Sequence, residues 1–100
     1  MNIYHIVLNE REVEKGMMDV VNGLNSVQQS IAMTIFSNSV VKVGDVFHKF
    51  IIKDDYLISR LHGLDVEEII VGDGVVLNYQ DINFLRSKTN RICGLISACQ

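Results

Sequence analysis

The stretch VEEIIVGDGVVLNYQDINFLRSK, residues 66–88, decides the fold of this chain. Residues 66–71 are mostly apolar and rich in β-branched side chains, which predicts a buried strand. A Gly-Asp-Gly loop follows at residues 72–74. Asn78, with an acid three residues later, then predicts the start of a helix over 79–88. A strand, a loop and a helix in this order are typical of a crossover between parallel strands.

The residues on either side of this stretch continue the same alternation. A short helix is predicted over 56–62, where Asp54 or Asp55 caps the start and Gly63 the end. Residues 92–98 predict a last strand. The second half of the chain therefore predicts helix, strand, helix and strand with short joints.

The first half begins with a predicted strand over 3–8. From Glu10 the apolar positions recur at helical spacing, and the other face of this predicted helix is polar. The apolar positions are Val13, Met17, Val20, Val21 and Leu24, and the polar positions are Glu12, Glu14, Lys15 and Asp19.

A second helix is predicted over 27–36, because Ser26 with Gln29 forms a capping-box pattern before it. Its inward positions are predicted to be Val27, Ile31, Thr34 and Ile35. Strands are predicted at 40–43 and 46–52, joined by a hairpin turn at Gly44-Asp45. The whole chain predicts one α/β or α+β domain over 1–100, a mixed sheet with helices packed on it, in the order β-α-α-β-β-α-β-α-β.

The apolar content points to a protein partner. Hydrophobic residues make up 48% of the chain and glycine adds 7 of its 100 residues, whereas the two together are usually about 45–50%. A domain of this size cannot bury such a surplus, so we expect a homo-oligomer or the binder of another protein. The predicted contact residues lie on the two N-terminal helices and include adaptable methionines. They are Met17, Met18, Met33, Ile35 and Phe36.

Charge and cysteine content favour a cytoplasmic protein. Charged residues interrupt every apolar run before it reaches about 18 residues, and the N-terminus lacks the pattern of a signal peptide. Cys93 and Cys99 lie in a predicted strand, too far apart for a disulfide, and are expected to be reduced. The net charge of −3 argues against a nucleic-acid partner.

The loop Gly72-Asp73-Gly74 is the alternative candidate site. Ligands of parallel sheets bind beyond the carboxyl ends of the strands, where this loop is predicted to lie. A small nucleotide could be held there by the loop together with Asn78 and Arg86. The competing interpretation is that the loop is only a tight turn, and that Arg86, Lys88 and Arg91 only complement a helix dipole.

Asp73, directly after a strand, also resembles the second acidic motif of P-loop nucleotide hydrolases. The companion motif GxxxxGK[ST] is absent, so no hydrolase activity is inferred. No GxSxG motif occurs, and Glu67 and Glu68 would face opposite sides of a strand. His5, His48 and His62 lack the spacing of paired metal ligands. The sequence thus predicts no enzyme activity, no cofactor and no metal.

The leading functional hypothesis is a small non-enzymatic regulatory protein that binds itself or another protein. Small, acidic and motif-poor chains of this kind resemble phage-encoded inhibitors of host systems, which implies a viral inhibitor. The alternative hypothesis is a nucleotide-sensing or nucleotide-sequestering protein. A third is an enzyme whose site is assembled between subunits.

Overall fold

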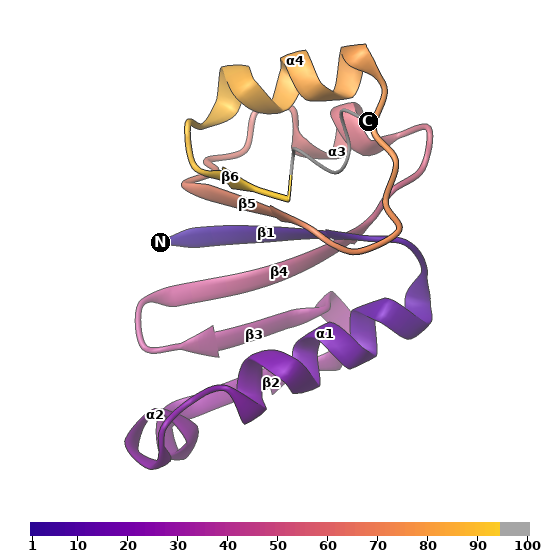
Figure 1. Cartoon of the computed structure of the whole chain (residues 1–100). Helices are drawn as coiled ribbons and strands as arrows, with labels where there is room; N and C mark the ends of the chain where they lie inside the picture. The colour runs from indigo at the N-terminus through magenta and orange to yellow at the C-terminus, as the bar shows by residue number, and fades with distance from the viewer. Residues whose placement is uncertain (95–100) are drawn as a thin grey trace.

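The computed structural model describes residues 1–94 and builds them around one mixed sheet with the strand order β2-β3-β4-β1-β5-β6 (Figure 1). The strands are β1 (Asn2–Val7), β2 (Ala32–Ile35), β3 (Val40–Val43), β4 (Val46–Ile52), β5 (Glu68–Val71) and β6 (Ile92–Cys93). The helices are α1 (Glu10–Asn22), α2 (Ser26–Ile31), α3 (Leu57–Leu61) and α4 (Tyr79–Lys88), with a 3-10 turn η1 (Phe36–Asn38). The predicted single α+β domain with a mixed sheet is confirmed.

The centre of the sheet is parallel and one side is antiparallel. β1 lies between β4 and β5 and runs parallel to both, and β5 runs parallel to β6. β3 pairs antiparallel with β4 and with β2. As a result, the carboxyl ends of β1, β4 and β5 all lie on the same side of the molecule.

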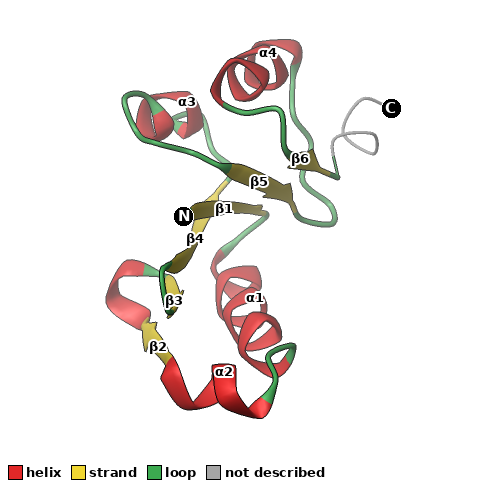
Figure 2. Ribbon diagram, turned by 90° about the vertical axis from the view of Figure 1, so that its left-hand side faces the viewer, coloured by secondary structure: helices red, strands yellow, loops and turns green. Residues whose placement is uncertain are grey.

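The two faces of the sheet carry two separate cores. Successive residues of a strand face opposite sides, so Tyr4 and Ile6 of β1 pack with Leu57 and Leu85 of α3 and α4. Val7, one residue further, packs on the other face with α1. Figure 2 shows α3 and α4 on one side of the sheet and α1 on the other.

Elements with clear end signals are confirmed. β3 and β4 have the predicted bounds, and Gly44 between them has a positive φ of 60°. α4 has the predicted bounds, and Asn78 and Asp81 form its capping box. α3 is one residue shorter at each end than predicted, with Gly63 in a left-handed conformation just beyond it. β5 begins two residues later than predicted.

The second predicted helix is wrong over most of its length. The helix starts at Ser26, one residue before the predicted start, because Asn25 with Gln28 forms its capping box instead of Ser26 with Gln29. It ends at Ile31, and Ala32–Ile35 form the edge strand β2. Val27 and Ile31 are 71% and 57% exposed, so they do not face inward as predicted. Apolar runs of this length fit either a helix or a strand, and pairing with β3 decided between them.

The remaining predictions concern the two ends of the chain. β1 ends one residue before the predicted position, and α1 ends before Leu24. The last predicted strand is observed as β6, while residues 95–98 and Cys99 lie outside the described residues. Cys93 is exposed, and within residues 1–94 it forms no disulfide. In the part of the chain that the structure describes, no helix is long and apolar enough to cross a membrane.

Candidate functional site

A groove of about 480 Å³ opens on the α1 side of the sheet, near the carboxyl ends of β1 and β5. The chain leaves β1 toward α1 on one face and leaves β5 toward α4 on the other (Figure 2). Loops that diverge in this way form the crevice where open parallel sheets bind ligands. We call this feature the sheet groove. Its lining comes from four parts of the chain. Residues 5–8 come from β1 and the position after it, Glu12, Lys15, Gly16, Asp19 and Val20 from α1, Phe50 from β4, and Ile70, Gly72 and Asp73 from β5 and the loop after it.

The predicted Gly72-Asp73-Gly74 site coincides partly with this groove. Gly72 and Asp73 line it. The amide of Gly72 donates to the carbonyl of Ile6 at 2.8 Å, and a Cβ on Gly72 would lie 3.1 Å from that oxygen. Gly74 has a φ of +81°, which favours glycine. The two glycines are therefore required by the backbone conformation of the loop. Asp73, whose side chain is exposed, is the residue of the loop that could contact a ligand in the groove.

The other two residues predicted for a nucleotide site lie elsewhere. The Asn78 side chain accepts a hydrogen bond from the amide of Asp81 at 2.8 Å, so it is occupied as the cap of α4. Arg86 lies in the last turn of α4, at the other end of the helix from the Gly-Asp-Gly loop that precedes it. Neither residue lines the sheet groove.

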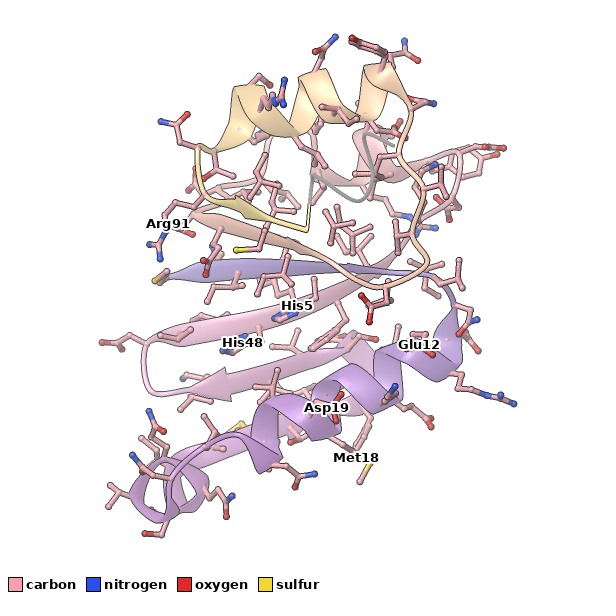
Figure 3. The ribbon with its side chains drawn as sticks, in the orientation of Figure 1. His5, Glu12, Met18, Asp19, His48 and Arg91 are labelled. Atoms are coloured by element: carbon pink, nitrogen blue, oxygen red, sulfur yellow. The ribbon has the colours of Figure 1, made fainter. Side chains whose placement is uncertain are left out.

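The charge of the sheet groove is predominantly negative. Glu12 and Asp19 of α1 and Asp73 of the loop bring three carboxylates, against one ammonium from Lys15. Within residues 1–94 none of these four side chains forms an ion pair. Figure 3 shows Glu12 and Asp19 along α1. This charge is opposite to the one that a phosphate group requires.

One residue that lines the groove, His5, contacts a second histidine, His48. His5 Nε2 lies 2.9 Å from His48 Nδ1 (Figure 3), and the His5 ring stacks on Phe50 with centroids 4.3 Å apart. Burial and the neighbouring His48 lower the pKa of His5 to about 4. Burial also lowers the pKa of His48, against the opposing effect of the Glu68 carboxylate. Both rings are therefore neutral at pH 7, and one can donate to the other.

The sequence did not indicate the histidine pair, because its members are 43 residues apart. Parallel pairing of β1 with β4 places His5 opposite Phe50, and His48 two residues earlier on the same face. The pair could not be predicted without knowing that β1 and β4 are neighbours in the sheet. His62 lies at the C-cap of α3 and is not part of the pair.

Most of the basic side chains that could have met a phosphate already have partners. Lys53 lies 3.5 Å from Asp81, and Arg60 lies 2.8 Å from Asp54. Arg91 pairs with Glu68 at 3.5 Å, and Lys88 donates to the carbonyl of Leu64. These contacts favour the structural interpretation of the basic residues over a phosphate site.

A second, apolar groove lies between α1 and the β2 edge of the sheet. A groove of about 180 Å³ separates α1 from β2 and η1, and is lined by Met17, Met18, Val21, Asn22, Thr34 and Phe36. Met18 and Phe36 are 61% and 68% exposed. Met17, predicted with them, lies instead in the core with 1% exposed, because it occupies the buried face of α1. Met33 is 55% exposed and Ile35 is half-buried.

Strand β2 forms the edge of the sheet next to this groove. It pairs with β3 on one side, and within residues 1–94 no strand pairs with its other side. Two exposed apolar side chains of α2, Val27 and Ile31, precede it. We define the edge surface as β2 together with Met18, Val27, Ile31 and Phe36.

Comparisons of the chain with protein-family models, with curated proteins and with solved structures found no match.

Proposed function

We propose that this protein functions by binding another protein chain at the edge surface, and that the chain bound is a second copy of itself. The observation that carries the proposal is the open edge of β2, flanked by exposed apolar side chains. An open edge presents unpaired backbone N–H and C=O groups, which a strand from another chain can satisfy.

The chemistry of the edge favours an extended, uncharged partner strand. Residues 31–41 contain no charged residue and the chain contains no proline, so this edge lacks the charges and prolines that often prevent strand pairing. Met33 on β2 and Phe36 just beyond it would bring apolar surface to the contact. Backbone pairing would supply affinity, and these side chains would supply the desolvated centre of the interface.

A second copy of the chain offers such a partner strand, because its own β2 is extended, uncharged and flanked by apolar side chains. Antiparallel pairing of β2 with the same strand of another copy has twofold symmetry. Each apolar side chain of the interface would therefore be buried in both copies. The chain carries a net charge of −3, but none of it lies in β2. Self-association at this edge therefore brings no like charges of the two strands together.

The oligomeric state tests the proposal. Native mass spectrometry and light scattering of the full chain should give a homodimer at micromolar concentration. Met33→Lys and Met18→Lys should each shift the mass toward the monomer, because a lysine would be buried without a partner. Val76→Lys is the matched control, since Val76 is 77% exposed on the loop before α4, away from the edge surface.

A monomer at all concentrations would overturn the proposal. An unchanged dimer in both lysine variants would also do so, because it would place the interface elsewhere. Circular dichroism of each variant would show whether the fold is retained.

A further inference from the structure

We propose that the sheet groove binds a linear aliphatic polyamine, a flexible chain with two or more protonated nitrogens. This site is separate from the edge surface and does not depend on dimerisation. The proposal follows from the place of the groove in the fold, the spacing of its carboxylates and the character of its floor.

The place of the groove is the one where a parallel sheet offers a ligand site. It opens between β1 and β5, whose following segments diverge to opposite faces of the sheet (Figure 2). Its volume of about 480 Å³ lies within the usual range for small-molecule sites, roughly 300–1,000 Å³. The groove is thus large enough for a molecule of many atoms and much larger than a single ion requires.

The carboxylates of the groove are spread out along it. Glu12 and Asp19 are seven residues apart on α1, which separates their α-carbons by roughly 10 Å along the helix. Asp73 comes from the loop after β5. Within residues 1–94 no three acidic, histidine or cysteine residues come together as a metal site would require. Dispersed negative charges match a ligand whose positive charges are dispersed as well.

The floor of the groove suits the hydrocarbon segments between the nitrogens. Val7, Leu8, Val20 and Ile70 line it with apolar surface. His5 is stacked on Phe50 and is neutral at pH 7, so it adds ring surface without adding positive charge. Methylene groups can pack on this floor while the ammonium groups approach the carboxylates.

Lys15 provides an internal test of the electrostatic argument. It lies between Glu12 and Asp19 on α1, is exposed, and forms no ion pair within residues 1–94. Its ammonium opposes a cationic ligand in the same groove. Removing it should therefore increase the affinity for a polyamine, whereas removing a carboxylate should decrease it.

The experiment is isothermal titration calorimetry of the full chain with spermidine at pH 7, with magnesium chloride titrated in parallel at equal ionic strength. Spermidine should bind and magnesium should bind much more weakly. Asp19→Asn and Asp73→Asn should each lower the affinity for spermidine by roughly threefold, and Lys15→Ala should raise it by a similar factor. Asp55→Asn, an exposed acid outside the groove, should leave the affinity unchanged.

Four outcomes would overturn the proposal. The first is no binding of spermidine, and the second is equal binding of spermidine and magnesium. The third is an equal loss of affinity in Asp55→Asn and Asp73→Asn, which would mean that the attraction comes from the overall charge. A tetralysine peptide that binds far more tightly than spermidine would assign the groove to a basic protein segment instead.

Discussion

At the scale of single residues, Gly16 determines how closely α1 packs on the sheet. A Cβ on Gly16 would lie 2.5 Å from Cε1 of Phe50, a ring that is itself buried and stacked on His5. The absence of a side chain at this position therefore brings the helix into direct contact with Phe50. The same contact forms part of the wall of the sheet groove.

Gly16→Val should lower the free energy of unfolding by about 2 kcal/mol, because the new methyl groups overlap a ring that cannot move freely. Urea denaturation followed by circular dichroism measures the change. Gly23→Ala is the control, since Gly23 has ordinary helical angles and its Cβ would meet only backbone oxygens at 3.4 Å or more. A loss of stability in the control as large as that in Gly16→Val would contradict the role given to Phe50.

His5 makes the stability of the fold depend on pH. Its pKa is about 4 in the folded chain, against 6.5 for an unperturbed imidazole. As the pH falls below 6.5, the unfolded chain binds a proton before the folded chain does, so unfolding becomes more favourable until the pH reaches about 4. Above pH 6.5 the ring is neutral in both states and contributes no slope.

His5→Phe should therefore flatten the pH dependence of stability between pH 6.5 and 4. The expected difference between wild type and variant over this interval is about 2 kcal/mol, after allowance for the partial exposure of the ring. Denaturation at a series of pH values measures it. His48 remains in the variant, so its contribution stays in both curves. Parallel curves would mean that His5 is not the titrating group.

At the scale of elements, two helices begin with the same capping box but differ in burial. Asn78 with Asp81 caps α4, and Asn25 with Gln28 caps α2. α4 buries Ile82 and Leu85, whereas α2 has no buried residue. The cap of α4 therefore holds a helix that supports the core, and the cap of α2 holds one on the surface.

Asn78→Ala should lower the free energy of unfolding by about 1–2 kcal/mol, and Asn25→Ala by about 0.5 kcal/mol. Local fraying of α2 need not unfold the sheet, which accounts for the smaller effect. Thermal or urea denaturation of both variants measures the difference. Equal losses would indicate that α2 is packed more firmly than its exposure suggests.

The sequence predicted those elements whose ends carry their own chemical signal. The Gly44-Asp45 turn fixed two strands, and the Asn78 capping box fixed α4. Ala32–Ile35 carried no such signal, and its conformation depends on pairing with β3, a contact between segments that sequence periodicity does not record. For the same reason the sequence showed that one face of α1 is polar but did not predict that Glu12 and Asp19 of this face line a groove.

The candidate sites were predictable only in part. The loop after β5 was correctly placed at the carboxyl end of a strand, since its glycines and acid follow an apolar run directly. Its neighbours in space could not be derived, because they depend on β1 lying between β4 and β5. Met18 and Met33, which were predicted as contact residues, are exposed, whereas the strand that carries Met33 was predicted as a helix.

At the scale of the whole molecule, the two candidate surfaces lie at different places on one sheet. The edge surface involves the antiparallel end formed by β2 and β3, whereas the sheet groove lies over the parallel centre (Figure 1). The parallel centre has a core on both faces. β2 and α2 contribute no residue to either core, so this end depends least on internal packing.

Hydrogen exchange should therefore distinguish the two parts of the sheet. Segments with few buried contacts open with low free energy, so amides of β2 should exchange faster than those of β1 when the protein is dilute. If β2 pairs with a second copy, its exchange should slow as protein concentration rises, because association stabilises the closed form by mass action. The amides of β1, already paired on both sides, should respond much less at the same concentrations. Exchange in β2 that does not depend on concentration would mean that this edge stays open, and that the protein functions without pairing there.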